Sequence, residues 1–117
     1  MFSKFFVLLL ATLTSSAFAD PAVFYCTDVN WSGNCHQSPI TVDQEGVCRN
    51  LKDDVARFND AISSFGPDED LHCTVFKDFD CPTNNLYNYA AIEYPGYADL
   101  RTIGWNDVIS SYTCYPY

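Results

Sequence analysis

Positively charged residues are scarce in this sequence. It holds 6 Lys and Arg against 15 Asp and Glu, and its formal charge is −9 at pH 7. Nucleic acids and anionic membrane surfaces attract proteins through basic patches. The excess of acid therefore argues against both as partners, and it favours cations as ligands or simply serves solubility.

Histidine is almost absent, and no catalytic spacing is present. His36 and His72 are the only two histidines, and neither stands in a metal-ligand or triad spacing. The many carboxylates leave a glycosidase-like acid pair open. We nevertheless expect that the protein has no enzymatic activity, because a small disulfide-rich protein seldom encloses a catalytic cleft.

Long apolar runs are missing after the N-terminus. Lys4 is followed by an apolar stretch over residues 5–13 and by Ala17-Phe18-Ala19, which is the order of a secretory signal peptide. The stretch is shorter than the ~20 residues that span a bilayer. We predict a signal peptide over residues 1–19 and a secreted, extracellular protein from residue 20 to residue 117, with a membrane anchor as the alternative.

Cysteines are even in number and lie after the predicted leader. An even count in a short secreted chain predicts disulfides, here three. No C-x2-C spacing of a structural zinc site occurs. Sequence alone leaves every pairing open among Cys26, Cys35, Cys48, Cys73, Cys81 and Cys114.

No linker or low-complexity tract divides residues 20–117, so we predict one domain. Short apolar runs alternate with turn residues, a spacing typical of a sandwich of antiparallel sheets. A single helical turn is expected within residues 51–58. The predicted strands cover residues 22–26, 35–42, 74–77, 86–92 and 110–114.

One octet occurs twice with conservative changes, as FNDAISSF at 58–65 and as WNDVISSY at 105–112. Asn and Asp start turns, and the Ile is the apolar position expected to point into the core. The Asp carboxylate, the Ser hydroxyl and free turn carbonyls are hard oxygen ligands, of which Ca²⁺ takes about six to eight. A metal-free turn capped by Asx and Ser side chains is the alternative.

The chain repeats beyond the octet. Asp28 and Asp78 each open a turn after a strand, and Asn50-Leu51 precedes the first octet as Asp99-Leu100 precedes the second. Two repeats are too few for a solenoid. We predict a duplicated unit, with halves at about residues 20–69 and 70–117 that pack on each other.

The octets carry a family signature. N/D-N/D-x-x-S/T-S is the calcium-binding motif of the βγ-crystallin superfamily, and residues 59–64 and 106–111 match it at every position. The chain resembles that superfamily, especially its small secreted, cysteine-rich fungal members. The resemblance implies an all-β fold in which two Greek-key units form one disulfide-stabilised antiparallel sandwich.

The resemblance also implies up to two Ca²⁺ ions. In this family each site is shared between the signature loop of one unit and the first turn of the other. Asp60 and Ser63 would then act with the turn at Asp78, and Asp107 and Ser110 with the turn at Asp28. The full predicted ligand set is Asn59, Asp60, Ser63, Asn106, Asp107, Ser110, Asp28 and Asp78.

The family's aromatic corner, which folds the first hairpin, is altered in both halves. In the first half Trp31 and Gly33 are in place, but the upstream aromatic is one or two residues too early. In the second half Phe76 is in place, whereas Cys81 replaces the second aromatic and Thr83 the Gly. A disulfide at Cys81 would pin that turn in place of the missing packing.

The implied fold suggests disulfide pairings. Cys26 and Cys35 lie on opposite arms of the first hairpin. The third strand of one unit joins the sheet of the other in this family, which would bring Cys48 near Cys114. Cys73 is then left with Cys81, an awkward pair along one segment.

Two surface features bear on partners. A Tyr-rich C-terminal half, if exposed, would suit a sugar or an extracellular protein, and otherwise serves strand packing. Asn30-Trp31-Ser32 is a candidate glycosylation sequon at Asn30.

The favoured function is a secreted, non-catalytic, calcium-stabilised domain. The alternative is a toxin, effector or protease inhibitor that acts on a foreign protein or cell wall.

Overall fold

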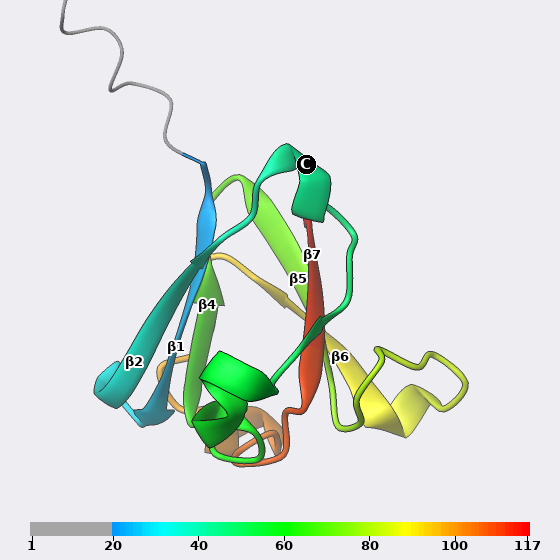
Figure 1. Ribbon diagram of the computed structural model, residues 1–117. Helices are drawn as coiled ribbons and strands as arrows, with labels where there is room; N and C mark the ends of the chain where they lie inside the picture. The colour runs from blue at the N-terminus through cyan, green and yellow to red at the C-terminus, as the bar shows by residue number, and fades with distance from the viewer. Residues whose placement is uncertain (1–19) are drawn as a thin grey trace, which may run out of the picture.

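Two antiparallel sheets pack face to face (Figure 1). This computed structural model describes residues 20–117, so the predicted signal peptide lies outside the described residues. One sheet has the strand order β2-β1-β4 and the other β3-β7-β5-β6. The strands are β1 (Ala22–Asp28), β2 (Ser32–Pro39), β3 (Arg49–Asn50), β4 (Ser64–Pro67), β5 (Leu71–Phe76), β6 (Tyr89–Glu93) and β7 (Ser111–Pro116).

Alternation along β1 shows why it forms a sheet with one buried face. Val23 and Tyr25 are buried, whereas Phe24 between them is 36% exposed. Val23 and Tyr25 pair with residues of β2 on one side and of β4 on the other. The same alternation fixes the register, because a shift by one residue would turn Phe24 inward.

Each half contributes a segment that pairs with a strand of the other half. β3, from the first half, pairs with β7 of the second at Arg49↔Tyr112. In return Tyr97, from the second half, forms a bridge with Phe65 on β4. The exchange matches the arrangement that the resemblance implied, and the predicted two-unit Greek-key sandwich is confirmed.

Aromatic rings fill the centre between the sheets. The ring of Tyr25 lies 5.0 Å from that of Phe58, 5.9 Å from Phe65 and 5.8 Å from Tyr112. Ile62 and Ile109, the apolar positions of the two octets, are both fully buried. The octets are thus anchored to the core at equivalent points.

Helical structure is limited to short 3-10 turns among residues 20–117: η3 (Val42–Gln44), η4 (Asp53–Phe58), η5 (Leu86–Asn88) and η6 (Leu100–Ile103). η4 lies within the predicted helical stretch. The predicted strand over 86–92 begins only at Tyr89, and the one over 35–42 starts earlier and ends at Pro39, which lacks an N–H to continue a ladder. No helix in the described part of the chain is long and apolar enough to cross a membrane.

All six cysteines form disulfides, as predicted, but two of the three suggested pairings were wrong. Cys26–Cys35 is confirmed. Cys73 pairs with Cys114 and not with Cys81. Cys73 on β5 and Cys114 on β7 lie directly opposite each other on these neighbouring strands. Cys48 pairs with Cys81 and not with Cys114, which links the segment before β3 to the turn after β5.

Candidate metal centre

The two octet loops lie side by side at one end of the sandwich and are joined reciprocally through their backbones. The N–H of Asp60 donates to the carbonyl of Ile109 at 3.0 Å, and the N–H of Asp107 donates to the carbonyl of Ile62 at 2.9 Å. The same two bonds, related by exchange of the halves, indicate a local two-fold arrangement. The duplicated sequence therefore builds one composite site from two loops.

The side chains are exchanged in the same way. The Ser63 hydroxyl donates to Asp107 Oδ1 at 3.2 Å, and the Ser110 hydroxyl donates to Asp60 Oδ1 at 3.2 Å. The sequence-based grouping placed Asp60 with Ser63 and Asp107 with Ser110. In the structure, each aspartate accepts a hydrogen bond from the serine of the other loop, because the loops face each other across the local two-fold axis.

The first turns lie against these loops through main-chain atoms. The Ser64 hydroxyl donates to the carbonyl of Asp28 at 2.9 Å, and the Ser111 hydroxyl donates to the carbonyl of Asp78. Asp107 thus reaches the loop that rests on the Asp28 turn, and Asp60 reaches the loop that rests on the Asp78 turn. The assignment of these aspartates and turns to shared calcium sites stays a prediction.

Sequence reasoning missed the role of Ser64 and Ser111. Both hydroxyls are fully buried, and each holds a turn in place. They are the last residues of the two signature motifs, so the signal was present.

Local backbone geometry fixes how the aspartates project. Asp60 has φ of 54° and Asp107 has φ of 60°, in the left-handed region that Asp and Asn tolerate better than most residues. The buried Ile two residues later clamps each loop to the core. The aspartate is consequently turned away from its own serine and toward the opposite loop.

The oxygen atoms present suit a hard cation. Two oxygens 3.2 Å apart, as in Ser63–Asp107, can both lie at about 2.3–2.6 Å from one Ca²⁺. Asn59 Oδ1 and Asn106 Oδ1 are buried and have no hydrogen-bond partner. Buried acceptors without a partner are unfavourable, and a cation or water would relieve them.

Carboxylates alone would not make this site. No cluster of three or more His, Cys, Asp or Glu side chains with metal-binding geometry occurs within residues 20–117. Any ion here would depend on hydroxyl, amide and main-chain oxygens in addition to one aspartate. That mixture fits calcium and does not fit a zinc site of nitrogen and sulfur ligands.

The walls beside the two loops are built differently. In the first half the rings of Phe24 and Trp31 pack at 5.9 Å, so Phe24 supplies the upstream aromatic despite its shifted position. In the second half the turn is held by Cys48–Cys81 and by Asn50, whose amide donates to Asp80 Oδ1 at 3.0 Å. A disulfide at Cys81 was predicted to replace the missing aromatic, and it does link the turn to the rest of the chain.

Comparison with known proteins agrees with this architecture. No family model and no curated protein matches the sequence. A solved structure from work on the evolution of the eye-lens βγ-crystallin domain fold matches with 25% identity and a TM-score of 0.64, over 85% of this chain and 89% of that one. The chain has the βγ-crystallin fold.

Two microbial βγ-crystallins are similar in structure but distant in sequence. One from an archaeon shares 17% identity at a TM-score of 0.60, over 80% of this chain and 96% of that one. One from Flavobacterium johnsoniae shares 23% identity at a TM-score of 0.58, over 80% of this chain and 93% of that one. These likenesses establish the βγ-crystallin fold, and the fungal-type subclass stays a prediction.

Asn30, the candidate glycosylation site, is exposed in the β1–β2 turn. Its N–H donates to the carbonyl of Ala98 at 2.7 Å, while the Ser32 hydroxyl of the sequon donates to the carbonyl of Val29 at 2.7 Å. The side chain is accessible in the way that a glycosylated residue requires. Its modification stays a prediction.

Proposed function

We propose that this is a secreted, non-catalytic βγ-crystallin domain that binds up to two Ca²⁺ ions and is stabilised by them. The observation that carries the proposal is the reciprocal pair of Ser–Asp contacts between the octet loops. Each contact brings a carboxylate and a hydroxyl from different halves to one place. Unpartnered Asn59 and Asn106 oxygens beside them support the same conclusion.

Bound calcium would supply positive charge beside the aspartates and beside the two asparagine oxygens that lack partners. The chain's own residues do the positioning: Ile62 and Ile109 anchor the loops, and the left-handed Asp60 and Asp107 cross over to the opposite serine. Because each site would draw on both halves, binding would oppose their separation. An affinity near 10⁻⁴ M at millimolar calcium would add about 1.4 kcal/mol per site.

The experiment is a calorimetric titration of calcium into chelator-treated protein that comprises residues 20–117. Wild type should release or absorb binding heat with up to two ions bound, and calcium should raise its melting temperature. Asp60→Ala and Asp107→Ala should each remove one site. Asp43→Ala, an exposed acid on η3, is the charge-matched control and should bind like wild type. No binding heat and an unmoved melting temperature in wild type would refute the proposal.

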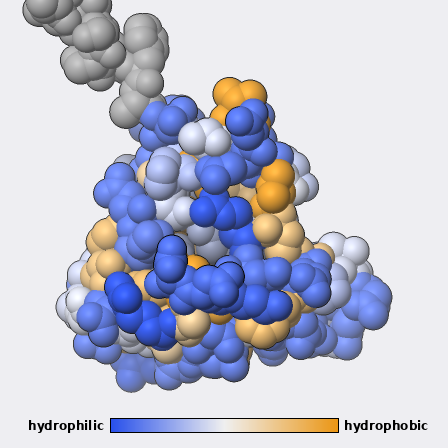
Figure 2. Space-filling model, viewed as in Figure 1, coloured by the Kyte–Doolittle hydropathy of each residue, from blue (hydrophilic) through white to orange (hydrophobic). Residues whose placement is uncertain are grey.

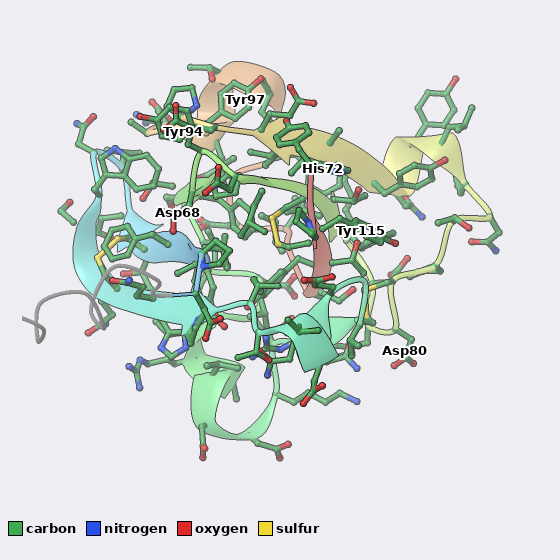
Figure 3. All side chains as sticks on the ribbon, turned by 90° about the horizontal axis from the view of Figure 1, so that it is seen from above. Asp68, His72, Asp80, Tyr94, Tyr97 and Tyr115 are labelled. Atoms are coloured by element: carbon green, nitrogen blue, oxygen red, sulfur yellow. A yellow bond between two sulfur atoms is a disulfide. The ribbon has the colours of Figure 1, made fainter. Side chains whose placement is uncertain are left out.

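An alternative function is recognition of a foreign protein or wall polymer, and one observation favours it. Tyr94 is 56% exposed, Tyr115 45% and Tyr117 75%, and the His72 ring packs on the last two. Figure 3 shows His72 beside Tyr115, with Tyr94 and Tyr97 near each other. Two shallow cavities of about 370 and about 340 Å³ share Tyr94.

Exposed tyrosines are well suited to sugar rings and protein partners. The face seen in Figure 2 is largely hydrophilic, with separate apolar patches. Sedimentation with insoluble chitin, cellulose and β-glucan, together with a panel of protease inhibition assays, tests this alternative. A positive result that Tyr94→Ala abolishes and Asp60→Ala leaves intact would favour recognition over the calcium proposal as the main role.

A further inference from the structure

One group of cationic side chains lies at the open edge of the sandwich, between β2 and β3. Carboxylates are abundant, yet the single ion pair within residues 20–117 joins Arg101 to Asp99, at 2.8 Å. Arg49 and Arg57 take no part in any ion pair of the described chain. In so acidic a protein, two guanidinium groups without carboxylates require an explanation.

Arg49 spans the edge from one sheet to the other. It belongs to β3, and its Nη2 donates to the hydroxyl of Ser38 on β2 at 3.2 Å. Ser38 is buried, and a hydroxyl that accepts one bond can still donate another. Arg49 Nη1 is buried as well but has no hydrogen-bond partner. A buried N–H of a charged group without an acceptor is strongly unfavourable.

His36 and Arg57 flank this guanidinium. His36 lies two residues before Ser38 on β2 and therefore projects from the same face of the strand. Its ring is 6.0 Å from that of Phe58, and the guanidinium carbon of Arg57 lies 4.9 Å from the centre of the same ring. Burial, and then the positive charges of Arg57 and Arg49, lower the pKa of His36. Both arginines are therefore close enough to act on this imidazole.

We propose that this edge is an oxyanion site, in which Arg49 Nη1 and the Ser38 hydroxyl bind a phosphate, sulfate or carboxylate group. Arg57 and His36 close the site from the η4 and β2 sides. A guanidinium presents planar N–H donors that match the oxygens of all three groups. The anion would satisfy the unpartnered Nη1 and replace the carboxylate that the chain does not provide. The site uses none of the predicted calcium ligands.

The two histidines make the test direct. Calcium-free protein is titrated at constant ionic strength with sodium sulfate, sodium phosphate and sodium acetate, against sodium chloride, while the ring signals of both histidines are followed by NMR. The ring signals of His36 should shift and reach a plateau as the oxyanion concentration rises. His72 should not, because it packs on Tyr115 and Tyr117 elsewhere on the molecule. The salt that acts at the lowest concentration identifies the preferred oxyanion.

Variants decide whether the arginines carry the effect. Arg49→Gln should weaken binding at least tenfold, and Arg57→Gln should weaken it severalfold. Arg101→Gln removes the same charge from the Asp99 pair and should bind like wild type. If Arg49→Gln does not fold, the exposed Arg57→Gln and the conservative Arg49→Lys replace it. A linear drift equal at both histidines, or equal affinity in wild type and Arg57→Gln, would overturn the proposal.

Discussion

The two halves of the molecule carry the same octet loop but different first turns. In the first half, β1 and β2 form a tight hairpin whose turn is braced by Phe24 and Trp31 and closed by Cys26–Cys35. In the second half, residues 77–88 separate β5 from β6, and η5 lies within that connection. The second turn is instead tied to the first half through Cys48–Cys81.

The two halves therefore hold the turn beside an octet loop in two different ways. Local packing and a short covalent loop hold the first turn, and its link to the second half is the backbone hydrogen bond from Asn30 to Ala98. The second turn depends on the first half, through the disulfide and through the Asn50–Asp80 hydrogen bonds. We therefore expect perturbations of equivalent residues to have unequal effects.

The largest difference should appear on removal of disulfides. In the chain-entropy view, a bridge stabilises more when it closes a longer loop. Cys48–Cys81 spans 33 residues and Cys26–Cys35 spans 9. Replacing both cysteines by Ala should cost about 4 kcal/mol for the first pair and about 2.5 kcal/mol for the second. Urea denaturation measures both, and equal losses would show that the second turn does not depend on the first half.

The disulfides also show where sequence reasoning stopped. Cys26–Cys35 was predictable because both cysteines fall on one short hairpin. Cys73–Cys114 depends on the register of β5 against β7, and that register is set by packing between segments 41 residues apart. No local pattern contains this information. Once Cys114 was assigned to the wrong partner, Cys48 and Cys81 were necessarily misassigned as well.

The loops themselves were far more predictable than their contacts. The repeated octet located both motifs and the inward Ile62 and Ile109, because a short motif determines its own turn and its own buried residue. Which serine meets which aspartate depends on how the halves face each other. That is a tertiary property, and the observed hydrogen bonds differ from the predicted grouping of Asp60 with Ser63 for this reason. The unpartnered Arg49 was invisible for the same reason.

Glycines before the two exchanged segments provide the next comparison. Gly46 precedes β3 with φ of 72°, and Gly96 precedes Tyr97 with φ of 82°. A Cβ on Gly96 would collide with the backbone of Gly66 and Phe65, whereas one on Gly46 would meet the side chain of Tyr115 at 2.8 Å. Tyr115 is 45% exposed and can move aside.

Gly96→Ala should accordingly destabilise the protein by about 3 kcal/mol or more, and Gly46→Ala by about 1 kcal/mol. Thermal and urea unfolding of both variants give the comparison. Gly104→Ala is the control for backbone strain alone, since φ there is 76° and no atom lies within 4 Å of the added carbon. If Gly96→Ala cost no more than Gly104→Ala, close backbone approach at the exchanged segment would not matter.

Double variants test the crossed serines and aspartates, on the basis of the proposed calcium binding. Ser63→Ala with Asp107→Ala alters one Ser–Asp pair and should leave one calcium site, worth about 1.4 kcal/mol at millimolar calcium. Ser63→Ala with Asp60→Ala alters both pairs and should leave none. Calorimetric stoichiometry distinguishes them. The opposite order of results would support the grouping predicted from sequence, of Asp60 with Ser63 and Asp107 with Ser110.

The smallest expected difference concerns His36, because the first half has this histidine on β2 and the second half has none on β6. Burial and the nearby Arg57 and Arg49 lower its pKa in the folded state below the ordinary 6.5. As pH falls through about 6.5, the unfolded chain therefore takes up a proton before the folded one does.

This contribution to stability is complete above the unfolded pKa and is lost as pH falls toward the folded pKa. Urea unfolding between pH 7.5 and pH 5 should show stability decreasing toward the acid side in wild type. His36→Gln should remove this component, and Arg57→Gln should reduce it because one of the two positive charges near the imidazole is gone. A His36→Gln protein that kept the wild-type slope would place the titrating group elsewhere. The first half's edge would then be no more sensitive to pH than the second.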